Sequence, residues 1–222
     1  MNPEAFEKKL YNARDIESNP NVEGIEVIRE FERALGKYKS FVGLASFGST
    51  LGGYGNKDCD IDVFILFDKP GDADAAHEDD YDKLRLRAFE WQEEIQKRGI
   101  KVDFRLQNVN PDSLIKSMKF WIGDRGTLGE YVPESLEAMT RVVTGNKIEG
   151  YRKELAVKLN ELDPDQKRIV VEETMRALIK RDESSLSKRM MRMPKLSKAE
   201  HQKILDERQT LWRSRLQKIW NL

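Results

Sequence analysis

The chain has 222 residues, of which 35% are charged and 39% are hydrophobic, and its formal net charge is zero. These proportions are typical of a globular protein and exclude a fully disordered chain, and the longest apolar runs, such as residues 63–67, are too short to cross a membrane. The single cysteine, Cys59, excludes an internal disulfide, and because the first residues contain no apolar secretory segment we expect a cytoplasmic protein.

The first half of the sequence alternates between predicted helices and predicted strands. Apolar residues at helical spacing predict helices over 3–14, 22–37 and about 78–98. Short runs rich in β-branched and aromatic residues predict strands over 40–46, 59–67 and 100–106. A glycine-rich stretch over 48–55 follows the first strand, and a turn over 68–72 follows the second. We therefore expect a small sheet with flanking helices.

Beyond Pro111 the pattern becomes helical for the rest of the chain. Apolar residues at helical spacing mark three expected helix faces: Tyr151, Leu155, Leu159 and Leu162; Val171, Met175 and Leu178; and Leu205, Trp212, Leu216 and Ile219. Prolines predict breaks within 162–166 and 191–197. The expected fold class is α+β, with an α/β lobe over residues 1–108 and an all-helical lobe over 109–222.

Aspartates occupy alternate positions at the start of the second predicted strand. Side chains two residues apart on a strand project to the same side, so Asp60 and Asp62 project together and Ile61 projects the other way. Neighbouring carboxylates repel each other unless a cation lies between them, and such hard oxygen ligands suit Mg²⁺. Asp103, on the third predicted strand, completes a two-metal cluster if that strand lies beside the second.

A phosphate-binding loop is predicted directly before these aspartates. Gly48 and Ser49 follow the first predicted strand, where backbone N–H groups and a hydroxyl can meet phosphate oxygens. The further glycines of this stretch allow a ligand to approach the backbone closely. The sequence therefore predicts that a nucleoside triphosphate lies between this loop and the aspartates.

The order of these motifs resembles that of the DNA polymerase β-type nucleotidyltransferase superfamily: Gly-Ser, a spacer, Asp-Ile-Asp, and a later lone aspartate on a strand. The resemblance implies a small mixed sheet with flanking helices, followed by a helical domain. It also implies that Gly48 and Ser49 bind the triphosphate and that Asp60 and Asp62 bind both of two Mg²⁺ ions. Asp103 would then bind one ion and assist deprotonation of the acceptor hydroxyl.

The implied reaction transfers a nucleoside monophosphate from an NTP to an acceptor hydroxyl and releases pyrophosphate. Residues 53–67 most resemble the archaeal-type CCA-adding tRNA nucleotidyltransferases, which favours an RNA 3′ end as the acceptor. The chain is far shorter than those tRNA enzymes. Asp58 has the same parity as Asp60 and Asp62, which leaves open which two of the three bind metal.

Several cations are candidates for contacts with the triphosphate. We expect these contacts from Lys57, Arg141 and Lys147, the last two because they flank Gly145 at the expected lobe junction. Arg105 and Arg152 are weaker candidates. For each of these cations taken singly, an ordinary surface position is the simpler explanation.

The C-terminal part of the chain is basic. From Arg176 to Leu222 there are 13 Lys and Arg residues against 5 Asp and Glu residues. Together with a nucleotidyltransferase lobe, this surplus favours RNA as a partner, although a solvated helix surface explains the charge alone. The alternatives are a small-molecule or protein nucleotidyltransferase, a non-catalytic nucleotide-binding module, and a glycine-rich hairpin with solubilising aspartates.

Overall fold

The computed structural model describes most of the chain between residues 22 and 213. The described ranges are 22–47, 60–129, 131–140, 142–145, 147–192 and 197–200, with positions 202, 203, 206, 209, 210 and 213. The expected helix over 3–14, the glycine-rich stretch and the expected apolar face that begins at Leu205 lie outside them. Contacts divide the chain into two compact units, Met1–Ser113 with Ala138–Tyr151, and Leu114–Glu137 with Arg152–Leu222. The expected boundary at residue 108 stays a prediction.

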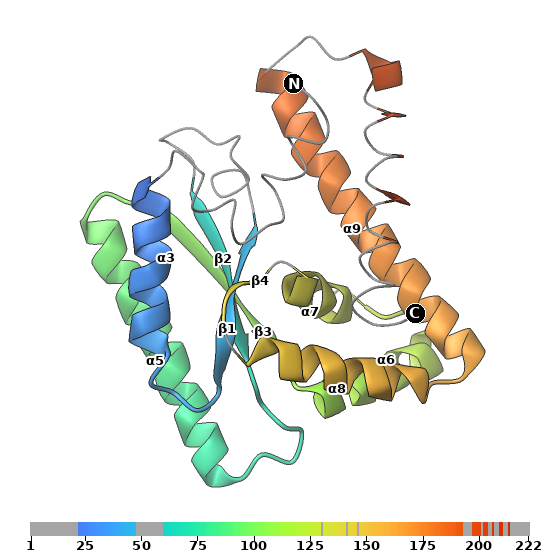
Figure 1. Cartoon of the computed structure of the whole chain (residues 1–222), viewed down its shortest axis with the longest axis horizontal. Helices are drawn as coiled ribbons and strands as arrows, with labels where there is room; N and C mark the ends of the chain where they lie inside the picture. Colours follow the sequence, from blue (N-terminus) through green and yellow to red (C-terminus); the bar gives the residue numbers. More distant parts are fainter. Residues whose placement is uncertain are drawn as a thin grey trace. The chain divides into compact units, whose positions relative to one another are not determined.

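The first unit contains a four-stranded mixed sheet in the order β3-β2-β1-β4 (Figure 1). Its strands are β1 (Phe41–Phe47), β2 (Ile61–Phe67), β3 (Val102–Asn108) and β4 (Val142–Thr144). β1 pairs antiparallel with β2 and with β4, whereas β2 and β3 run parallel. Parallel neighbours need a long crossover, and helix α5 (Ala75–Lys97) supplies it. The predicted α+β fold class is thereby confirmed.

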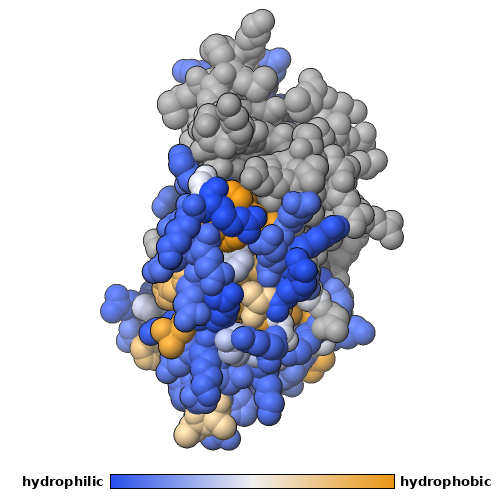
Figure 2. All heavy atoms as spheres, turned by 90° about the vertical axis from the view of Figure 1, so that its left-hand side faces the viewer, coloured by the Kyte–Doolittle hydropathy of each residue, from blue (hydrophilic) through white to orange (hydrophobic). Residues whose placement is uncertain are grey.

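One face of this sheet is covered by α3 (Val22–Leu35) and α5, which lie side by side in Figure 1. Alternate residues of β2, namely Ile61, Val63 and Ile65, join the core on this face. Between the helices, the rings of Phe31 and Trp91 stack with centroids 3.8 Å apart. Burying each large apolar side chain contributes about 1.5–3 kcal/mol. The outer side of this helical layer is mostly hydrophilic (Figure 2), as expected of amphipathic helices.

Helix ends in this unit follow local signals in the sequence. α3 ends at Leu35, and the N–H of Gly36 donates to the carbonyl of Glu32 at 2.7 Å. α5 starts at Ala75, three residues before the predicted start, because the Asp74 carboxylate accepts a hydrogen bond from the His77 N–H at 2.9 Å. Gly99, with φ +82°, allows the chain to leave α5.

The second unit is built from helices. They are α6 (Pro111–Arg125), α7 (Tyr131–Thr140), α8 (Ile148–Asn160) and α9 (Pro164–Arg192). The first residues of α6 and α8 and the last of α7 belong to the first unit. The predicted break within 162–166 is confirmed: Pro164 opens α9, and the Asp163 carboxylate accepts from the N–H of Gln166 at 2.9 Å. No helix in the described ranges is long and apolar enough to span a membrane.

The expectation of a purely helical chain beyond Pro111 is wrong at β4. Val142, Val143 and Thr144 are β-branched and pair with β1, far back in the sequence. A run of three residues is too short for a period-2 pattern. Only the open edge of β1 determines that this run becomes a strand.

Candidate active site

The parallel register of β2 and β3 brings two of the predicted carboxylates together. Asp62 and Asp103 are direct Cα partners in this register. Their sequence neighbours Ile61 and Val102 are also partners and belong to the core beneath α3 and α5. Because side chains alternate along a strand, Asp62 and Asp103 project from the opposite face of the sheet.

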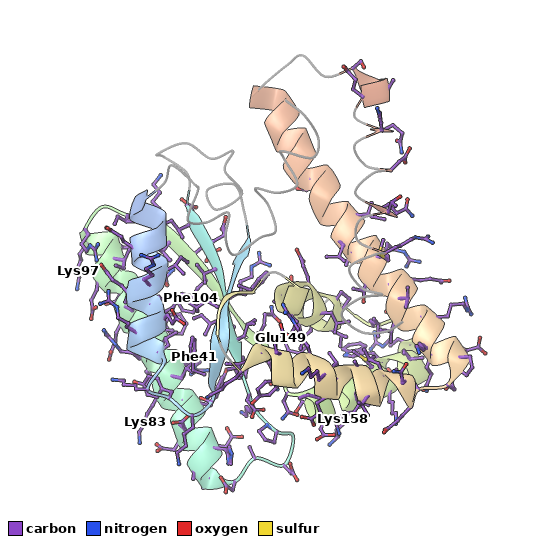
Figure 3. The ribbon with its side chains drawn as sticks, in the orientation of Figure 1. Phe41, Lys83, Lys97, Phe104, Glu149 and Lys158 are labelled. Atoms are coloured by element: carbon purple, nitrogen blue, oxygen red, sulfur yellow. The ribbon has the colours of Figure 1, made fainter. Side chains whose placement is uncertain are left out.

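The surroundings of Phe104 confirm this orientation. Its ring lies 6.1 Å from that of Phe31 on α3 and 5.1 Å from that of Phe89 on α5. Figure 3 shows Phe104 on the side of the sheet where these helices lie. Asp103 precedes Phe104 on the same strand, so its carboxylate points away from both helices.

The third predicted ligand, Asp60, comes directly before β2. It is exposed, as is Asp103, whereas Asp62 is half-buried. The next residue, Ile61, donates its N–H to the carbonyl of Lys101 at 2.9 Å, so the hydrogen bonds between β2 and the β3 side begin directly after Asp60. The carboxylates thus come from the starts of two parallel strands, at an edge open to solvent.

The end of β1 meets the same edge. Phe47, the last residue of β1, is the Cα partner of Asp62. Gly48 and Ser49 come next in the sequence and, like Lys57, lie outside the described residues. The chain therefore leaves the sheet next to Asp62, and the predicted phosphate-binding residues follow at that point.

The donor set fits Mg²⁺, although the described residues do not form a complete metal cage. No three His, Cys, Asp or Glu side chains of the described ranges come together in a group that holds a metal ion. Mg²⁺ usually takes one or two protein carboxylates and keeps water and substrate phosphates as its other ligands. The Asp62–Asp103 pair supplies ligands of that kind and number.

Lys147 is not at this edge, which corrects its prediction as a triphosphate ligand. Its ammonium group donates to the carbonyls of Phe41 at 2.9 Å and of Lys39 at 3.1 Å. Phe41 pairs with Phe67, at the opposite end of β1 and β2 from the carboxylates. At about 3.3 Å per residue, the length of β1 separates the two ends by roughly 20 Å. Arg141 lies outside the described residues.

Arg105 lies closer to the carboxylates than Lys147 does. It follows Asp103 by two residues on β3, so it projects from the same face, and its Cα partner is Phe64. The side chain is exposed. From the sequence, Arg105 was a weaker candidate for contact with the triphosphate. Alternation along the predicted strand nevertheless placed it on the same face as Asp103.

The opposite edge of the sheet holds a polar network. Asp68 accepts hydrogen bonds from the Asn110 amide at 2.7 Å and from the Tyr151 hydroxyl at 2.8 Å. Asn108 donates to the carbonyl of Lys69 at 2.8 Å and accepts from its N–H at 3.1 Å. These groups hold the loop after β2 and the start of α6 against each other. We assign this edge a structural role.

Comparison with known protein families agrees with this geometry. Residues 28–121 match the family model of the nucleotidyltransferase domain. This segment resembles a nucleotidyltransferase domain. It runs from within α3 into α6 and contains Asp60, Asp62 and Asp103, so the resemblance to polymerase β-type nucleotidyltransferases is confirmed for it. No curated protein and no solved structure matched the chain significantly.

Proposed function

We propose that the protein transfers a nucleoside monophosphate from an NTP to an acceptor hydroxyl. Nucleotidyltransferase domains perform this class of reaction, and the match of residues 28–121 to the model of such a domain supports the proposal. The observation that carries the proposal is the pairing of Asp62 with Asp103 across β2 and β3, on the face of the sheet opposite the core beneath α3 and α5. Repulsion between two such carboxylates gives the fold no benefit, so a cationic ligand explains their position.

In the proposed reaction the acceptor oxygen forms a bond to the α-phosphorus, and the bond between that phosphorus and the oxygen that bridges it to the β-phosphorus breaks. Pyrophosphate leaves, and the acceptor proton passes to the Asp103 carboxylate. Asp60, Asp62 and Asp103 would hold two Mg²⁺ ions, which neutralise charge on the attacking and leaving oxygens when bound. Gly48, Ser49, Lys57 and Arg141 would contact the triphosphate, and Arg105 replaces Lys147 in this set.

As acceptor we propose the 3′ end of an RNA, tRNA-like in kind. The support is the basic C-terminal part, with 13 cationic against 5 acidic residues from Arg176 onward, together with the resemblance of residues 53–67 to CCA-adding enzymes. A small-molecule or protein acceptor would need no such surplus.

Incubation with each of the four labelled NTPs, Mg²⁺ and total cellular RNA tests the proposal. Label on RNA in a denaturing gel is the expected result. Label on protein, or on small molecules alone, would leave the transferase activity standing and refute the RNA acceptor. If no NTP releases pyrophosphate with Mg²⁺ and any of these acceptors, the domain is a non-catalytic nucleotide-binding module.

A further inference from the structure

The second unit contains a groove along helix α9, and three of its cations belong to the basic C-terminal part from which RNA binding is proposed. Its volume is about 990 Å³, and α9 residues from Pro164 to Lys180 line it together with Gln209 and Arg213. The apolar part of its lining includes Val171, Met175 and Ile179. These residues lie four apart, so they form one stripe of about 12 Å along the helix.

The lining of this groove is cationic. Lys167, Arg168, Arg176, Lys180 and Arg213 all contribute to it, and Glu172 is the only acidic residue among the described lining. Two of these cations also take part in ion pairs along the surface of α9: Arg168 with Asp165 at 3.6 Å and with Glu172 at 3.4 Å, and Arg176 with Glu173. Even with these acidic partners counted, five cations face three anions.

An apolar stripe within a cationic lining selects among partners. Single-stranded nucleic acids usually bind where aromatic side chains stack on the bases, whereas an amphipathic helix places apolar residues at every third or fourth position into a groove. The apolar residues of α9 in this lining repeat every four residues, which matches the second kind of partner. If its flanks are acidic, its carboxylates meet the cations of the lining, which favours association and fixes orientation.

We propose that this groove docks an acidic amphipathic helix of a partner protein. Apolar side chains of that helix contact the half-buried Val171 and Ile179 above the buried Met175, and its carboxylates pair with Lys180 and Arg213. The proposal goes beyond the transferase reaction and does not depend on it, because it rests on the second unit alone.

The test uses the full chain and a labelled synthetic peptide with leucine at heptad positions a and d and glutamate at the flanking positions. Fluorescence anisotropy should show binding, and the variant K180E/R213E should weaken the binding at least about 10-fold. The matched control K116E/K153E changes the net charge equally at exposed positions of the second unit and should leave the affinity within about twofold. A peptide with glutamine in place of leucine keeps the charge and should not bind.

Several results would overturn the proposal. If the leucine peptide fails to bind, the groove does not accept such a helix. If both double variants lose affinity equally, or if the glutamine peptide binds as well, the attraction is unspecific charge. If single-stranded RNA binds more tightly than the peptide and K180E/R213E abolishes that binding, the groove is a nucleic-acid surface. NMP transfer measured on the same preparations tests the transferase proposal separately.

Discussion

Two carboxylates side by side on neighbouring strands are the feature on which the functional proposal depends. Asp62 and Asp103 are Cα partners, and partners on adjacent strands lie about 5 Å apart. At that distance two negative charges repel by about 1 kcal/mol in water and by more at a partly buried position. A bound Mg²⁺ ion would offset this repulsion, so the pair favours binding of a divalent cation.

The substitution Asp62→Asn is expected to abolish transfer and keep the fold. It removes a charged metal ligand but keeps the shape of the side chain, so incorporation of labelled NMP should fall at least about 100-fold. The free energy of unfolding should change by about 1 kcal/mol or less. Asp82→Asn, at an exposed position of α5, is the control and should leave the activity unchanged. Full activity of the Asp62→Asn protein would refute the assignment of the site.

Asp80 provides a prediction that is independent of function. Burial raises the pKa of this carboxyl, but the Ser40 amide, which donates at 2.8 Å, and the Lys39 amide at 3.3 Å outweigh burial, so the pKa is lowered. A lowered folded-state pKa stabilises the fold above the unfolded value of 3.8, and this stabilisation is lost as the pH falls through the folded value.

Asp80→Asn should therefore lower the free energy of unfolding by about 1–2 kcal/mol at pH 7. The difference from the unsubstituted protein should shrink as the pH falls below the unfolded pKa of 3.8, because the carboxyl then becomes protonated as well. Urea unfolding at pH 7 and at pH 3 measures both values. An equal difference at both pH values would show that the charge of Asp80 does not stabilise the fold.

Strand β4 depends on a glycine that follows it directly. Gly145 has φ +123°, and a Cβ atom there would lie 2.5 Å from the Val42 carbonyl oxygen and 2.8 Å from the Gly43 Cα. The backbone of β1 therefore leaves no room for any larger residue at this position. Gly150, in α8, has open space around the equivalent atom.

Gly145→Ala should consequently destabilise the fold by about 2–3 kcal/mol, from the strained backbone and the close contact. Gly150→Ala is the matched control and should stabilise by up to about 1 kcal/mol, because alanine favours a helix. Thermal unfolding of both variants checks the contrast. Similar effects of the two substitutions would contradict the close approach of Gly145 to β1.

How much of this could be predicted depended on how local each signal was. The first three strands were placed to within two residues, because the first two are β-rich runs and the third alternates apolar and polar residues. The face shared by Asp62 and Asp103 followed from alternation, but their adjacency required the pairing of β2 with β3. That pairing joins segments that are distant in the sequence. The metal cluster could therefore be predicted only on the condition that β3 lies beside β2.

The predicted contact of Lys147 with the triphosphate is wrong for a related reason. Its position next to Gly145 suggested a lobe junction near the triphosphate, but proximity along the chain does not determine which end of the sheet a residue reaches. Antiparallel pairing of β4 with β1 returns the chain toward the start of β1, where Lys147 meets the carbonyls of Lys39 and Phe41. A sequence pattern carries no signal for that return.

Over the whole molecule, charge is distributed unevenly along the chain. The formal net charge is zero, but 13 of the 39 Lys and Arg residues and only 5 of the 39 Asp and Glu residues fall between Arg176 and Leu222. If the acceptor is RNA, cations of this part neutralise phosphates and release counterions, so binding must weaken as salt increases. The NTP, held by metal ions and by a few residues of the sheet edge, should respond much less.

Steady-state kinetics at about 50 and about 200 mM salt, a range over which counterion release changes affinity strongly, separate these two contributions. The KM for RNA should rise about 20- to 50-fold if three to four phosphates are neutralised, since each contributes about −0.7 to the logarithmic slope. The KM for NTP should change by no more than about threefold, because contacts much shorter than the Debye length are screened weakly. A KM for RNA that is flat over this range would mean that the basic part of the chain does not bind the acceptor, and a small-molecule or protein acceptor would then explain the transferase domain better.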